Sequence, residues 1–158
     1  MSLIKTNAIT TVAGKPILNS TGSILQVVQA TTTAAISVTT STPTASGFIA
    51  SITPSSASSK ILVRLMGGAQ NWGSTGVTLT IYMYRSIGGG AYSSLGKFEN
   101  FIQGSSYGNP HSIEYLDSPA TTSAVSYQPY LSMVTSNRGD LNDTTGCTLA
   151  LTLMEVSA

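Results

Sequence analysis

Charged residues are unusually few in this sequence. Of its 158 residues, seven are Lys or Arg and six are Asp or Glu, a charged fraction of 8%, where a typical soluble domain has about 25%. The basic residues are scattered between Lys5 and Arg138, without the clusters that displace counterions from nucleic acid or attract a membrane surface. We therefore expect no nucleic-acid partner and no membrane partner.

Cysteine, histidine and long apolar runs are also nearly absent. The single Cys147 excludes a disulfide within the chain. No apolar run approaches the ~20 residues of a membrane span, and the first 16 residues lack the apolar core of a signal peptide. We expect a protein that is made and folded in a cytoplasm. At the start of an apolar strand, Cys147 is expected to be a buried, inert thiol.

No catalytic motif is present. Glycosidases need two carboxylates across a sugar ring, but Glu114 and Asp117 are expected on opposite faces of one strand end. We interpret all six carboxylates as solvated or turn residues. They are Glu99, Glu114, Asp117, Asp140, Asp143 and Glu155. The only histidine, His111, follows Asn109-Pro110 and is expected in a loop. A Ser–His–Asp triad stays open on the sequence alone, although no G-x-S-x-G elbow occurs.

The sequence also lacks a recognisable metal loop. Asp140 and Asp143 faintly resemble part of a calcium loop, but the alternate ligands and the closing Glu of that pattern are missing. A plain turn is the favoured interpretation, and whether these two residues bind an ion stays open. We expect no catalytic residues, no cofactor and no metal, and hence a protein that is not an enzyme.

Short alternating segments are what the sequence does contain. In Lys60–Met66 and Val77–Arg85, aliphatic residues occupy every second position, which is typical of strands with one buried face. Further strands are expected at Ile24–Gln29, Ala35–Thr40, Gly47–Ile52, Leu95–Ile102 and Cys147–Val156. With about eight or nine short strands and no helical stretch, one all-β domain is predicted, as a sandwich or barrel.

The stretch Ser112–Leu131 is expected to form two antiparallel strands joined by a turn at Asp117-Ser118-Pro119. Three other breaks are interpreted as connections. They are the glycine-rich stretch from Gly67 to Gly73 around Trp72, the loop Gly104–Pro110 and the polar loop Asn137–Gly146. Gly88–Gly90 is expected to be a turn that uses positive φ.

The N-terminal residues 1–23 have no clear period, and Pro16 blocks a helix there. We predict an extended anchoring arm, followed by a β-sandwich domain at residues 24–158. The alternative is a frayed terminus, although disordered tails rarely carry so many aliphatic residues. The expected docking residues of the arm are Ile4, Ile9, Val12, Pro16, Ile17 and Leu18.

Several long segments resemble one family of proteins. They are GKPILNSTGSILQVVQ (Gly14–Gln29), ITPSSASSKILVRLMGG (Ile52–Gly68), SIEYLDSPATTSAVSYQ (Ser112–Gln128) and LTLMEVSA (Leu151–Ala158). Together and in this order, they are similar to virion proteins of tailed bacteriophages, especially phages of cyanobacteria and marine bacteria. The motifs are structural in character and name no active site.

This resemblance implies an antiparallel β-sandwich of jelly-roll type that assembles as a homotrimer in the virion. The family includes small stand-alone virion proteins and tail-fibre tip modules, so two roles compete. A capsid decoration (cement) protein would dock by its arm on the major capsid protein. A fibre tip would sit among tail components and bind the host, through a surface glycan for example. The ~24 residues before the first strand carry no heptads and are too few for a stem, which favours decoration.

Candidate contact residues lie on one strand face and in the loops. Tyr82 and Tyr84 share the face opposite the aliphatic one, and exposed tyrosines suit both protein interfaces and sugar sites. Trp72 is interpreted equally well as a receptor contact or as a buried residue that fills space in the core. The full set of possible interface or receptor contacts is Trp72, Tyr82, Tyr84, Tyr92, Arg138 and Asp140. The adhesion tripeptide that begins at Arg138 is best explained by chance.

Overall fold

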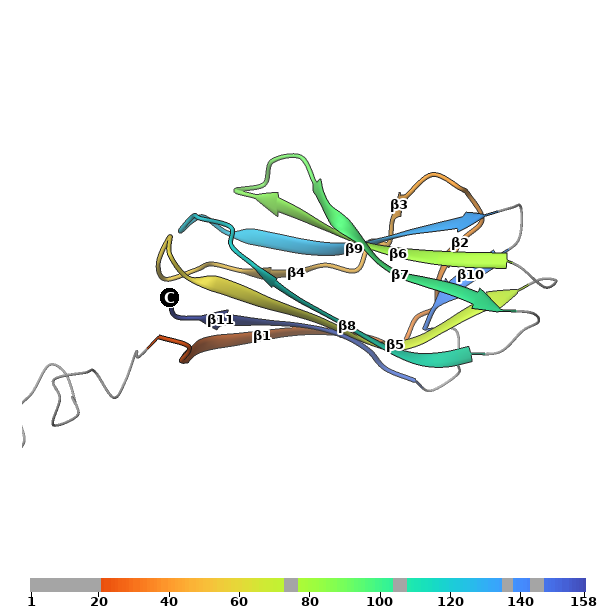
Figure 1. The fold of residues 1–158 in the computed structure, drawn as a ribbon, viewed down its shortest axis with the longest axis horizontal. Helices are drawn as coiled ribbons and strands as arrows, with labels where there is room; N and C mark the ends of the chain where they lie inside the picture. Colours follow the sequence, from red (N-terminus) through yellow and green to blue (C-terminus); the bar gives the residue numbers. More distant parts are fainter. Residues whose placement is uncertain (1–20, 73–76, 104–107, 135–137, 143–146) are drawn as a thin grey trace, which may run out of the picture.

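The computed structural model of the chain describes residues 21–72, 77–103, 108–134, 138–142 and 147–158. In these residues the regular structure is all β-strand, arranged as two antiparallel sheets packed face to face (Figure 1). This is the all-β sandwich that the sequence predicts. None of the described segments forms a helix with the length and apolarity that a bilayer crossing needs.

The first sheet is built around one long central strand, β5. Its strands are β1 (Ile24–Thr32), β2 (Ile36–Val38), β5 (Lys60–Trp72), β8 (Gly108–Asp117), β10 (Arg138–Leu141) and β11 (Leu149–Val156). One edge of β5 pairs with β8, and the other pairs with β11 and then, further along, with β10. β1 pairs with the outer edge of β11, and β2 with that of β10. The sheet is therefore four strands wide.

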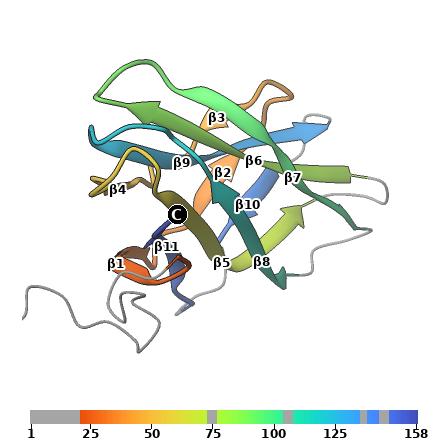
Figure 2. The same cartoon turned by 60° about the vertical axis from the view of Figure 1, so that its left-hand side comes forward.

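The second sheet is also four strands wide. Its strands are β3 (Thr44–Ala45), β4 (Ala50–Ile52), β6 (Val77–Ile87), β7 (Ser93–Gln103) and β9 (Val125–Val134). β9 pairs with β6 on one edge and with both short strands, β3 and β4, on the other. β7 pairs with the free edge of β6. Figure 2 shows the two layers from a second angle.

The strand order is that of a jelly roll. Eight strands form two facing sets, β1-β11-β5-β8 and β4-β9-β6-β7. Of the three remaining short strands, β3 lies at the edge of the second sheet, and β10 lies between β5 and the edge strand β2 in the first. Among the described strands, β6 and β7 alone are neighbours both in sequence and in a sheet. Every other connection passes to the opposite sheet or to a non-adjacent position, as in double-sheet jelly rolls. The predicted fold type is confirmed, and the structure has eleven described strands where about eight were expected.

The core lies between the two sheets and follows the predicted alternation. Along β5, Ile61, Val63 and Leu65 are fully buried, while Arg64 and Met66 lie on the outer face. The fully buried aliphatic and methionine side chains of the other long strands are Leu79, Ile81, Met83, Val125, Leu131, Met133, Leu149, Leu151 and Leu153. Because β-strand side chains alternate between faces, each outer face receives the remaining residues.

The predicted hairpin within Ser112–Leu131 is wrong. Its first half is β8, which pairs with β5 in the first sheet, and its second half is β9, which pairs with β6 in the second. The segment between them crosses from one sheet to the other, through Ala120 in the left-handed region at φ 52°. Alternation shows which face of a strand is buried but carries no information on its partner.

Two of the predicted connections are strands. β5 continues through Gly67 and Gly68 to Trp72, and β10 occupies the first half of the expected polar loop. The glycines serve close packing here. A Cβ at Gly67 would lie 2.6 Å from Leu149 Cδ1, and one at Gly139 would lie 2.6 Å from Met133 Sδ. By contrast, Gly88 and Gly89 do form the predicted turn, at φ 59° and 76°.

Smaller corrections concern single residues. β8 begins at Gly108, so His111 is a buried strand residue and not a loop residue. Cys147 precedes β11 and is exposed, so the prediction of a buried thiol is wrong. β1 begins at Ile24. Residues 1–20 lie outside the described part of the chain, and the arm stays a prediction.

Candidate functional site

The structure brings three of the predicted contact residues together with a fourth on the outer face of the second sheet. We call Tyr82, Tyr84, Tyr92 and Tyr130 the tyrosine cluster. The rings of Tyr84 and Tyr130 stack with centroids 3.8 Å apart and an interplanar angle of 18°. Tyr92 tilts against Tyr130 at 6.2 Å, and Tyr82 is opposite Tyr130 in the β6–β9 register. All four side chains are half-buried.

The strands dictate this arrangement. Because Ile81 and Met83 face the core, the neighbouring tyrosines of β6 must face outward. Tyr84 and Tyr130 are diagonal neighbours on adjacent antiparallel strands, a spacing that aromatic rings can bridge. Tyr130 was missed from the sequence, although its alternation with the buried Leu131 places it on this face.

The hydroxyl group of Tyr130 stays protonated at neutral pH. Burial raises the pKa of Tyr130, and the neighbouring Tyr84 and Tyr92 raise it further. A protonated phenol both donates and accepts hydrogen bonds. The exposed Lys97 lies opposite Tyr82 on β7, and Ser132 Oγ lies 3.4 Å from the Tyr82 hydroxyl. The cluster therefore offers flat aromatic faces with hydrogen-bonding groups beside them.

The outer face of the first sheet carries a different surface, the apolar row. Val27, Met154, Leu62 and Leu116 lie opposite one another in register on β1, β11, β5 and β8. Val27 is 56% exposed and Leu116 47% exposed, while the other two are half-buried. Ile24, 58% exposed, adjoins the row at the start of β1. Exposed apolar groups that form one contiguous surface mark interaction sites, unlike scattered ones.

A polar row bounds the apolar row on one side. Gln29 Nε2 donates to Thr152 Oγ1 at 2.8 Å, and Arg64 pairs with Glu114 at 3.0 Å. These residues are also in register across the sheet. Because Arg64 and Glu114 are well exposed, their ion pair contributes little to stability and mainly sets the edge of the apolar surface.

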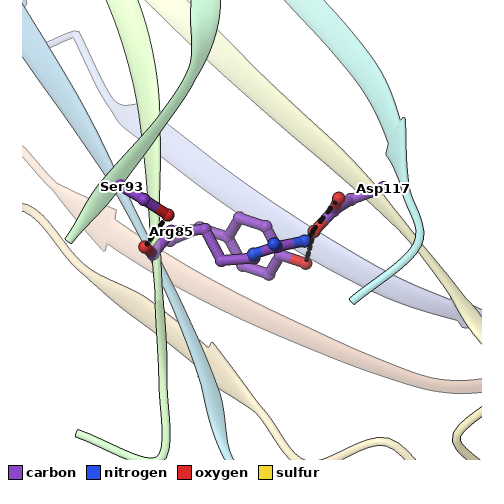
Figure 3. A network of polar contacts seen from close by, with 4 residues as sticks. Arg85, Ser93 and Asp117 are labelled. Atoms are coloured by element: carbon purple, nitrogen blue, oxygen red, sulfur yellow. Dashed lines mark hydrogen bonds and ion pairs between the residues drawn. The ribbon is translucent and has the colours of Figure 1, made fainter. Parts of the chain in front are cut away.

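The carboxylates do not all occupy solvated or turn positions, contrary to prediction, since Asp140 and Glu155 are buried within strands. Asp117, at the end of β8, is buried and accepts hydrogen bonds to both oxygens from Arg85 Nη1 at 2.8 Å (Figure 3). Tyr127 Oη donates to the same carboxylate at 2.7 Å. Burial and this hydrogen bond raise the pKa of Tyr127 strongly. Arg85 and Tyr127 belong to the second sheet, so this cluster ties the two sheets together.

Glu155 is a second buried carboxylate. Burial alone would raise its pKa, but hydrogen bonds from Ser55, Gln26 and Ser59 outweigh burial and lower it to about 2. The contact with Gln26 Nε2 is 2.6 Å, and those with the Ser55 amide and hydroxyl are 2.7 and 2.6 Å. These bonds tie the loop after β4 to β1 and β11. Ser55 and Ser59 also line a cavity of about 490 Å³ at this end of the sandwich.

Asp140 is fully buried and accepts a hydrogen bond from Arg138 Nε at 2.8 Å. Its predicted role as a contact residue is therefore corrected. The tripeptide lies in β10, between β5 and β2, and not in a loop. Arg138 itself is 47% exposed. Trp72 is the last residue of β5, but its side chain lies outside what the structure describes, as does Asp143.

The six predicted docking residues of the arm, Ile4, Ile9, Val12, Pro16, Ile17 and Leu18, all lie outside the described residues. His111 is buried on β8, and burial lowers its pKa to about 4. In the described part of the chain, no three residues among His, Cys, Asp and Glu lie close enough to hold a metal ion. The surfaces on which a function can be argued are the tyrosine cluster and the apolar row.

Comparisons with known proteins add little to this description. No protein-family model matches the chain, and no curated protein matches it. Among solved structures, a chain in the structure of infectious bursal disease virus Gx strain aligns at 15% identity and a TM-score of 0.39. The alignment covers 96% of this chain and 43% of that one, so this chain spans less than half of its length. A TM-score this low establishes no relationship, and the jelly-roll assignment depends on the strand order alone.

Proposed function

We propose that this protein is a non-enzymatic virion structural protein, a homotrimeric capsid decoration protein that docks through residues 1–23. The observation that carries the proposal is the character of the two outer faces. One presents the apolar row and the other the tyrosine cluster, with few charges on either. Such faces suit burial against other proteins in an assembly.

The buried carboxylates support a structural role. Asp117, Asp140 and Glu155 each bond to groups of the protein's own sheets or loops. Carboxylates engaged in this way stabilise the sandwich and are not displayed to a substrate. The resemblance of four segments to tailed-phage virion proteins points to the same class, and the strand order agrees with the jelly roll that this resemblance implies.

A tail-fibre tip is the second candidate function, and the tyrosine cluster favours it. Tyr92 lies just after the exposed Gly88–Gly90 turn, so part of the cluster adjoins a loop at the edge of the sheet. Aromatic faces beside hydroxyl and ammonium groups also suit a glycan on a host surface. In this role the cluster would contact the receptor instead of a shell protein.

Locating the protein on intact particles separates the two functions. A gold label on a C-terminal tag, imaged on virions that contain the protein, should spread over the shell if the protein decorates the capsid. Label confined to the tail would overturn decoration and support the fibre tip. Absence of the protein from purified particles would overturn both.

A further inference from the structure

The apolar row is open to solvent in the described part of the chain, and the N-terminal segment joins the sheet beside it. The amide of Gly22 donates to the Ser157 carbonyl at 2.8 Å, and the Ser157 amide donates to the Ser23 carbonyl at 2.9 Å. These bonds fix the chain at the start of β1, next to Ile24. Figure 1 shows this point and the C-terminus at the same end of the sandwich.

The backbone turns at this point. Thr21 and Gly22 form a turn, and Gly22 has φ 86°, in the left-handed region that glycine adopts readily. The residues before it include Leu3, Ile4, Ile9, Val12, Ile17 and Leu18 and no acidic residue. A segment with this many aliphatic side chains has a hydrophobic reason to find an apolar surface.

The lengths are compatible. The apolar row crosses four adjacent strands, three spacings of ~4.8 Å, or about 14 Å. An extended chain covers that distance in about five residues, and 20 residues precede Thr21. The segment can therefore reverse direction near Gly22 and still cross the whole row.

We propose that, in the free protein, residues 1–20 lie across the apolar row of their own chain. The segment of the same chain is favoured because it is covalently joined to the sheet at Gly22, and a short covalent connection gives an effective concentration in the millimolar range. A second copy at micromolar concentration competes poorly with it. The polar row on one side of the surface limits where the segment can lie.

This inference concerns the free chain and does not depend on the proposed function. It adds a consequence if that function holds. Docking of the segment on a neighbouring subunit would uncover the apolar row at the same moment. Free copies would then keep the apolar row and the aliphatic side chains of the segment covered until a particle offers a better partner.

Photocrosslinking in the full chain tests the inference. p-Benzoylphenylalanine in place of Leu116, at the far end of the row from β1, should crosslink to residues 1–20 on irradiation. An equal mixture of ¹⁵N-labelled and unlabelled chains shows by mass spectrometry whether each crosslink lies within one copy. The same photoprobe in place of Ser51, exposed on the second sheet, is the control and should give no such crosslink.

We expect crosslinks in which both peptides carry the same isotope, and a crosslinked product with the mass of one chain. Peptides that mix the two isotopes would overturn the inference and assign the row to a second copy. Absence of crosslinks to residues 1–20 would also overturn it. A chain with Ile9→Ser, Val12→Ser, Ile17→Ser and Leu18→Ser should lose the crosslink, whereas Thr6→Ser, Thr10→Ser and Thr11→Ser should retain it.

Discussion

Two carboxylates three residues apart on β8 should differ sharply in their contribution to stability. Asp117 is buried against Arg85, whose side chain is 21% exposed, whereas Glu114 is 53% exposed beside Arg64. Removing one partner of a buried pair leaves the other charge uncompensated. We expect Asp117→Asn to lower the free energy of unfolding by about 3 kcal/mol.

The matched control for Asp117 is Glu114→Gln on the same strand. It should lower the free energy of unfolding by less than ~1 kcal/mol, because exposed ion pairs contribute little. Urea unfolding followed by circular dichroism measures both variants. Equal losses in the two would show that the Asp117 cluster does not hold the sheets together.

His111 should make stability depend on pH in the weakly acidic range. Burial lowers its pKa from 6.5 to about 4, so between these values the unfolded chain binds a proton that the folded chain does not. The free energy of unfolding should therefore fall by about 3 kcal/mol as the pH drops from 6.5 to 4. Urea midpoints across this range for the protein and for His111→Gln measure the effect. If the stability of His111→Gln changed with pH as steeply as that of the unsubstituted protein, groups other than His111 would cause the effect.

Glu155 should make stability depend on pH in a more acidic range than His111 does. Its pKa is lowered from 4.5 to about 2, so its contribution is complete above pH 4.5 and is lost as the pH falls towards 2. The expected loss is about 3 kcal/mol across that window. Glu155→Gln should flatten the pH dependence below 4.5 and leave the His111 range unchanged. If Glu155→Gln instead flattened the pH dependence of stability between pH 4.5 and 6.5, the two residues would not act in separate pH ranges.

At the scale of strands, β10 packs closely against the second sheet at Gly139. A Cβ there would lie 2.6 Å from Met133 Sδ and 2.8 Å from Leu79 Cδ1, both in the core. Gly139→Ala should lower the free energy of unfolding by about 2 kcal/mol through overpacking. Gly67→Ala should cost less, since its nearest contacts are all with one residue, Leu149, whereas those at Gly139 involve two core side chains. Thermal unfolding of both variants tests this order, and a larger loss for Gly67→Ala would reverse it.

The sequence predicts the strands of this protein better than their partners. Alternation along β5, β6 and β11 correctly assigns Ile61, Leu79 and Leu151 to the core. It fails at Gly67 and Gly139, because glycine marks both turns and close strand packing. It also fails for the expected hairpin, since Leu116 and Val125 belong to different sheets and strand alternation is the same in either case.

The candidate surfaces were only partly predictable for a related reason. Tyr82 and Tyr84 follow from the alternation of one strand. The apolar row does not, because Val27, Leu62, Leu116 and Met154 come from four strands and meet only through register. The burial of Asp117 likewise depends on Arg85 and Tyr127 in the opposite sheet. Contacts between distant segments leave no local pattern in the sequence.

At the scale of the whole molecule, the low charge predicts salt-resistant assembly if the protein decorates a capsid. Ionic contacts between exposed groups are screened at 1 M salt, whereas apolar burial is not weakened. Particles incubated in 1 M NaCl at pH 7 should retain the protein, as measured by pelleting and gel densitometry. Sucrose of equal osmolality controls for rupture. Release by salt alone would contradict docking through apolar surfaces.

The pairing of β1 with β11 has a consequence for biosynthesis. β11 is the last strand of the chain described here, yet it lies between β1 and β5 in the first sheet. A ribosome that adds 5–20 residues per second needs roughly 8–30 s for 158 residues. During that time β1 and β5 expose unpaired edges, which are prone to aggregate. The first sheet can close only once the nascent chain has delivered β11, so β1 stays without its partner until more than 110 further residues have been made.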